Sequence, residues 1–175
     1  MMNNFDIYFG IPLMIVLTIL QATLMARFPI FGAVPQLLFL VALAWGLHRG
    51  TEAGLLWAFL AGFFLDLFSA SPMGLNILTM MAAILVITIL QQSLPQNRFI
   101  LPIIQALAGT LMYTLAYLLL LRLFNFLPDL SGLNNMPGIL LANLVVFLPV
   151  YWLLFSLRRA LGVQRLDIGS SGIES

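Results

Sequence analysis

One acidic side chain lies inside an almost unbroken apolar run. Asp66 belongs to the stretch AGFFLDLFSASPMGLN (61–76), and the chain has only six acidic residues. Because a carboxylate is costly to place within a membrane, such a residue is expected to have a defined role. Three roles are open: a clamp that caps the N-terminus of the following helix, a contact that organises a protein-binding surface, or a ligand or proton site.

The remaining residue types argue against catalysis. An intramembrane aspartyl protease needs two carboxylates that share a proton, and the expected spans hold no second acid apart from Glu52 at a helix end. The chain has no cysteine and a single histidine, His48, too few for a zinc site or a thiol nucleophile. The motif G-x-S-x-G and the P-loop are also missing. We therefore expect a protein that is not an enzyme and needs no metal or cofactor.

The overall composition is that of an integral membrane protein. Hydrophobic residues make up 62% of the chain and charged residues 7%, whereas roughly a quarter of the residues in a soluble domain are charged. The net charge is +1 and basic residues are not clustered. The sequence therefore gives no indication of nucleic-acid binding.

Apolar segments divide the chain into helices. A spanning helix needs about 20 apolar residues, and the candidates are 7–26, 34–48, 52–70, 73–94, 99–125 and 137–160. The sequence predicts an all-α, polytopic membrane protein with about six transmembrane helices, of which the second is short. We expect one membrane domain over residues 1–161 and a polar, disordered cytoplasmic tail over residues 162–175.

The arginines predict the orientation. With the N-terminus inside, the inner side carries five arginines and the outer side carries Arg27 and Arg122. The inner arginines are Arg49, Arg98, Arg158, Arg159 and Arg165. Because positive residues accumulate on the cytoplasmic side, both termini are expected in the cytoplasm.

Small residues share one helix face with Asp66. Gly54, Ala58 and Gly62 precede it at intervals of four residues, so all four lie on one stripe. Such a stripe allows a second helix backbone to approach closely, and Asp66 should then point at protein.

Further polar residues fall in the same outer half of the membrane. With Asp66 they form an expected polar cluster, which is either a closed network or a pocket. Its members are Gln21, Asp66, Asn76, Arg122 and Asn143. Arg122 could pair with Asp66 or extend to the outer interface. Tyr113, Tyr117 and Trp152 could supply the aromatic walls of a pocket.

The segment 54–86 resembles the family of the bacterial rod shape-determining protein MreD. It contains a Gly-x-x-x-Asp step followed by Pro-x-Gly, which places Gly62, Asp66, Pro72 and Gly74 at the positions of the family motif. A short second span that opens at Pro35 also fits. Family members often carry an acid or another polar residue after the proline; Gln36 departs from the acid at this position.

The resemblance implies a role in an assembly. MreD-like proteins are non-catalytic inner-membrane subunits of the cell-elongation machinery that help to coordinate peptidoglycan synthesis with MreB filaments. Their expected partner is MreC, through its transmembrane helix and juxtamembrane region, with RodA and a class B penicillin-binding protein as indirect partners. The implied fold is similar to that of the substrate-binding subunits of energy-coupling-factor transporters, an analogy that does not transfer function by itself.

Two functions therefore stand as predictions. The first is a scaffold that packs against MreC, the lipid bilayer and a second copy of itself. Its candidate packing surfaces are the 54–62 stripe, the pair Ala22 and Ala26, and the set Ala106, Thr110 and Thr114. The alternative is a small-molecule or lipid-binding subunit of a membrane transporter, which uses the outer polar cluster as a pocket.

Overall fold

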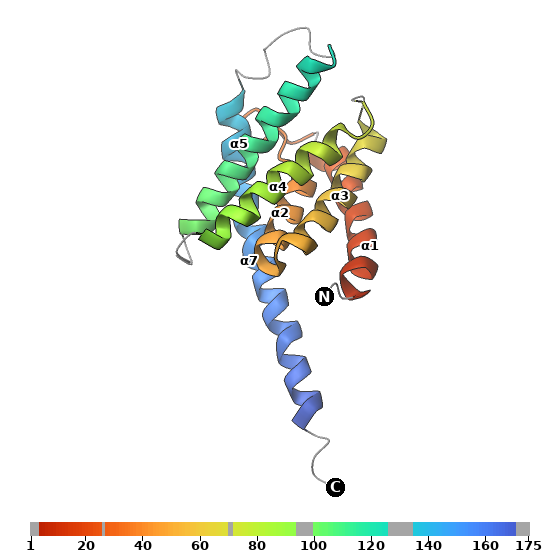
Figure 1. The fold of residues 1–175 in the computed structure, drawn as a ribbon, viewed down its shortest axis with the longest axis vertical. Helices are drawn as coiled ribbons and strands as arrows, with labels where there is room; N and C mark the ends of the chain where they lie inside the picture. Colours follow the sequence, from red (N-terminus) through yellow and green to blue (C-terminus); the bar gives the residue numbers. More distant parts are fainter. Residues whose placement is uncertain (1–3, 26, 70–71, 94–99, 126–134, 171–175) are drawn as a thin grey trace.

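The computed structural model describes residues 4–25, 27–69, 72–93, 100–125 and 135–170 (Figure 1). These residues form helices and no β-strand. The helices are α1 (Asn4–Leu20), α2 (Leu37–Arg49), α3 (Thr51–Phe68), α4 (Leu75–Ser93), α5 (Ile100–Leu123) and α7 (Met136–Ser170), and a short π-helix, η1 (Gln21–Met25), continues α1. The predicted all-α, polytopic fold is confirmed.

Four of these helices are long and apolar enough to cross a membrane. They are α3, most of α4, α5 and the Met136–Ser156 part of α7. Helix α2 is shorter than a full span, as its apolar run predicts. The first helix contains the apolar stretch Gly10–Thr23, within a helical backbone that runs from Asn4 through η1 to Met25.

Helix α7 differs from its prediction at the C-terminal end. The sequence predicts that residues 162–175 are disordered. Instead, the helical backbone continues through Ser170 and extends beyond the other helices (Figure 1), whereas 171–175 lie outside the described residues. Once a helix is nucleated, each further residue adds a hydrogen bond at little cost, and this stretch holds no proline.

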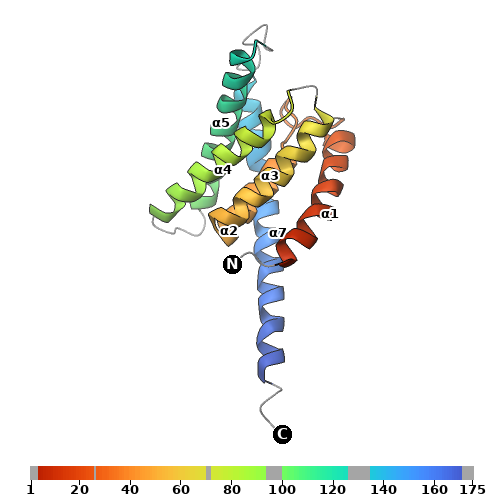
Figure 2. The same ribbon diagram turned by 45° about the vertical axis from the view of Figure 1, so that its right-hand side comes forward.

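Helix α2 is the centre of the bundle. Its residues from Leu37 to Gly46 are all buried, and it packs against α1, α3, α4, α5 and α7. Around it, α1 packs on α3, α3 on α4, α4 on α5 and α5 on α7 (Figures 1 and 2). The circle is incomplete, because α1 and α7 make few contacts with each other. A helix enclosed by protein need not match the thickness of the bilayer, which explains why α2 can be short.

Glycines allow α2 and α3 to cross closely. A Cβ atom on Gly54 would lie 2.7 Å from the Cα atom of Gly46, and Ala58 is fully buried on the same face. Beside this crossing, the rings of Trp45 and Trp57 stack with 4.4 Å between their centroids. The small-residue stripe is therefore occupied by helices of its own chain.

The start of α1 and the end of α7 lie at the same end of the bundle (Figure 1). A chain that crosses the membrane an even number of times would have its two ends arranged in this way.

We expect Gly54→Ala to destabilise the bundle, because its new methyl group meets backbone at the crossing. Overpacking of this kind costs about 1–3 kcal/mol. Thermal unfolding in detergent, followed by tryptophan fluorescence, measures the effect. Gly10→Ala is the matched control, because its Cβ atom would lie 3.5 Å from the nearest neighbouring atoms. An unchanged midpoint for Gly54→Ala would contradict the close crossing.

Candidate functional site

Asp66 lies near the C-terminal end of α3 and is only 6% exposed. Its Oδ2 atom accepts a hydrogen bond from the N–H of Gly74 at 2.9 Å. Its Oδ1 atom accepts from the backbone N–H of Asn76 at 3.1 Å and from the Asn76 side-chain amide at 2.8 Å. A longer contact of 3.4 Å joins Oδ2 to the N–H of Ile77. The carboxylate therefore caps the N-terminus of α4, where the backbone N–H groups lack partners within the helix and the helix dipole favours an anion.

The other three motif positions lie in the same junction between α3 and α4. Gly62 is one turn before Asp66, and a Cβ atom there would lie 2.5 Å from the Cα atom of Ile77. Gly74 has a φ of +95°, which favours glycine. The carbonyl of Pro72 accepts the N–H of Leu75 at 3.2 Å. The absent side chain of Gly62 lets the start of α4 approach α3, and the turn at Gly74 brings its amides to Asp66.

Asn76 extends this junction to α5. Its Oδ1 atom accepts the hydroxyl of Tyr113 at 2.9 Å, and both side chains are buried. The ring of Tyr113 stacks on Phe39 of α2, with 4.8 Å between the centroids. One chain of contacts thus connects α3, α4, α5 and the central helix.

A second polar network holds the start of α2. The Oδ1 atom of Asn143, on α7, accepts the backbone N–H of Gln36 at 2.8 Å. Its Nδ2 atom donates to Gln36 Oε1 and to Thr110 Oγ1, each at 3.4 Å. Gln21 Oε1 accepts the N–H of Leu38 at 3.3 Å. Neutral side chains from α7 and η1 therefore satisfy the first amides of α2, as Asp66 does for α4.

The expected five-residue cluster is thus two networks, and Arg122 belongs to neither. Arg122 is exposed near the end of α5, and within the described residues it makes no ion pair with Asp66. It follows Tyr113 by nine residues, or about 13 Å along a helix, which carries it past the start of α4. Pairing of Asp66 with Arg122 was therefore a wrong alternative.

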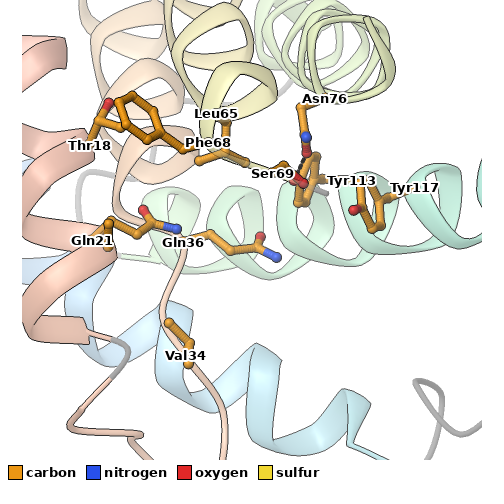
Figure 3. A pocket seen from close by; sticks show the side chains of 11 residues that line it. Thr18, Gln21, Val34, Gln36, Leu65, Phe68, Ser69, Asn76, Tyr113 and Tyr117 are labelled. Atoms are coloured by element: carbon orange, nitrogen blue, oxygen red, sulfur yellow. Dashed lines mark hydrogen bonds between the residues drawn. The ribbon is translucent and has the colours of Figure 1, made fainter. Parts of the chain in front are cut away.

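A cavity of about 390 Å³ lies beside both networks (Figure 3). Its lining comes from α1, η1, the segment before α2, the end of α3, and the helices α4 and α5. The lining residues are Thr18, Gln21, Ala22, Val34, Gln36, Leu65, Phe68, Ser69, Asn76, Tyr113 and Tyr117. Of the three aromatic residues that the sequence suggests for a pocket wall, Tyr113 and Tyr117 line the cavity and Trp152 does not. The structure also places Gln36 in the lining of the cavity. The only sign of this role in the sequence is that a polar residue directly follows Pro35.

We expect Asp66→Asn to lower the stability of the protein by at least about 2 kcal/mol. The new amide group would place N–H donors against backbone donors, and a buried donor without a partner costs about 1–3 kcal/mol. Chemical or thermal unfolding in detergent measures the loss. Glu52→Gln is the matched control, an acid-to-amide change at an exposed position of the same helix. Equal stability of the two variants would refute the cap.

Comparison with known proteins gives one family. The family described as rod shape-determining protein MreD matches residues 3–161. No curated protein and no solved structure matches the chain, so the similarity to energy-coupling-factor subunits stays a prediction. The family match spans all the residues that hold α2 and α4 in place, and the chain therefore belongs to the MreD family of rod shape-determining membrane proteins.

Proposed function

We propose that this chain is a non-catalytic scaffold of the rod-shape system in the cytoplasmic (inner) membrane, and that it binds MreC. Membership of the MreD family supports the role in cell shape. The polar chemistry of the chain supports a scaffold, because Asp66, Asn76 and Asn143 are engaged in joining helices to one another. Side chains used in this way hold a fixed surface against which a partner can pack.

The small-residue stripe cannot be that surface. Gly54 and Gly62 already face Gly46 and Ile77 of the same chain. Ala106, Thr110 and Thr114 are also buried within the bundle. Ala22 is exposed but lines the cavity, and Ala26 lies outside the described residues. Gly62→Leu would therefore weaken assembly by disturbing the α3–α4 junction, whichever surface the partner uses.

The incomplete side of the bundle is the better candidate for the helix of MreC. Helices α1 and α7 are the two members of the circle around α2 that pack little against each other. Both carry exposed apolar side chains, such as Ile15 and Val16 on α1 and Val145 on α7. A single transmembrane helix placed between them would complete the circle, because van der Waals packing between apolar side chains contributes to helix association in lipid.

The proposal implies that the wider assembly lies on both sides of the membrane. With both termini in the cytoplasm, MreB would meet the cytoplasmic side of the complex. MreC would carry the connection to RodA and a class B penicillin-binding protein through its juxtamembrane region. The exposed apolar faces of α4 and α5 remain available to lipid or to a second copy of the chain. The alternative, a ligand-binding transporter subunit, is supported by the cavity alone, and the family match favours the scaffold.

Disulfide cross-linking tests the proposed docking side. The chain has no cysteine, so every introduced thiol is unique. We expect Ile15→Cys and Val145→Cys to cross-link to cysteines placed in the transmembrane helix of a co-expressed MreC. Leu78→Cys on α4 and Leu119→Cys on α5 are the controls, because these exposed positions lie on helices away from the open side.

Cross-links at the control positions and none at the test positions would place the partner elsewhere on the bundle. Failure of MreC to co-purify with the unmodified chain would contradict the scaffold proposal itself.

A further inference from the structure

Two glutamines in the cavity have amide groups whose orientation is fixed. Gln21 must direct Oε1 at the N–H of Leu38, because a backbone N–H can only donate. Asn143 uses Oδ1 for the N–H of Gln36, so its Nδ2 atom must donate to Gln36 Oε1. Within the described part of the chain, the Nε2 atoms of Gln21 and Gln36 make no hydrogen bond. Both glutamines therefore contribute N–H donors to the cavity that they line.

Tyr117 supplies a third donor from the opposite wall. Its ring stacks beside Tyr113 with 6.0 Å between the centroids, and its hydroxyl has no hydrogen-bond partner among the described residues. The hydroxyl of Tyr113, in contrast, is engaged with Asn76. Figure 3 shows the side chains of Gln21 and Gln36 extending in the direction of this tyrosine pair. The cavity thus combines unused donors with a flat aromatic wall.

The charges around the cavity favour an uncharged ligand. None of its lining residues is charged. The nearby carboxylate of Asp66 lies behind Asn76 and accepts hydrogen bonds from both the backbone N–H and the side-chain amide of Asn76. An anion would find no cation to offset its desolvation and would meet a like charge. A cation would face the unused donors of two amides. An uncharged group with acceptor oxygens suits this lining best.

The rim of the cavity indicates where the ligand comes from. Ala22, Val34 and Phe68 are exposed apolar residues, with Phe68 70% and Val34 40% exposed. In a membrane-embedded bundle, such a rim is suited to acyl chains. A volume of about 390 Å³ is within the usual size of ligand pockets, about 300–1,000 Å³. It suits the head of a lipid whose tails remain in the bilayer.

We propose that this cavity binds the head of an uncharged lipid through its carbonyl oxygens, as a diacylglycerol presents them. The amides of Gln21 and Gln36 and the hydroxyl of Tyr117 donate to those oxygens, and the lipid tails leave over Ala22, Val34 and Phe68. The proposal for this site does not depend on the proposed MreC contact.

Photo-cross-linking of the full-length chain in phosphatidylcholine nanodiscs tests the site. The probe is a photoactivatable dioctanoylglycerol, the competitor is unlabelled dioctanoylglycerol, and peptide mass spectrometry locates the products. We expect cross-links within 18–22, 34–36, 65–69 and 113–117. Gln36→Leu and Tyr117→Phe should each raise the competitor concentration needed for half inhibition about fivefold, the loss of one hydrogen bond.

Two controls separate binding from folding. Gln92→Leu makes the same substitution on an exposed part of α4 outside the cavity and should leave competition unchanged. Tyr117→Phe removes one oxygen that has no partner among the described residues, so the thermal midpoint should stay unchanged while binding weakens.

Other outcomes would overturn the proposal. Cross-links spread over all exposed faces would show lipid solvation without a site. Equal competition by dioctanoylphosphatidylglycerol would show that the cavity does not select an uncharged head. Stronger competition by octyl glucoside or by a short-chain quinone would show that the cavity binds a sugar or a quinone ring and not a diacylglycerol.

Discussion

The structure depends on a carboxylate that meets the first backbone amides of a helix inside an apolar bundle. Helix α4 begins where α3 ends, and its first N–H groups would otherwise lie buried without a partner. Asp66 accepts from Gly74 and from Asn76, and it can do so because Gly62 lets the two backbones approach. Since water is scarce in this environment, the contact contributes more to the stability of the protein than a cap at the surface would. The positions of Asn76 and Tyr113 follow from it.

The central helix meets the same constraint with neutral groups. Helix α2 begins inside the protein, and Asn143 and Gln21 accept its first amides. Amides differ from a carboxylate in one respect, because each amide that accepts through its oxygen retains an N–H₂ group that can donate. The amides that cap α2 therefore leave N–H donors at the cavity wall. The carboxylate that caps α4 has no donor, and Asn76 covers it. The same amide network that stabilises the start of α2 therefore supplies hydrogen-bond donors to the cavity.

The sequence predicted the elements well and their neighbours poorly. The four-residue spacing of Gly54, Ala58, Gly62 and Asp66 placed them on one closely packed face, and the short apolar run near 34–48 indicated a short helix. Periodicity defines the face of a helix but not what covers it, so the same stripe also suggested a partner surface that the chain itself occupies. The position of Arg122 depends on how far α5 extends past α4, which hydropathy does not show.

Contacts between distant segments were the hardest to predict. Gln36 and Asn143 are 107 residues apart in the sequence, and each looks like an isolated amide in an apolar run. Only the position of α7 against the start of α2 brings them together. The family resemblance, in contrast, rested on the local junction around Asp66, where the sequence separation is short, and it is confirmed by the match over residues 3–161.

Hydrogen exchange at the start of α4 tests the central claim most directly. The unmodified chain in nanodiscs would be followed by mass spectrometry with fragmentation fine enough to resolve single amides. If Asp66 holds the helix start, the amides of Gly74 and Asn76 should exchange at least about a hundredfold more slowly than in an unstructured peptide, because exchange then requires opening of the junction. Exchange of these two amides at the rate of an unstructured peptide would contradict the account.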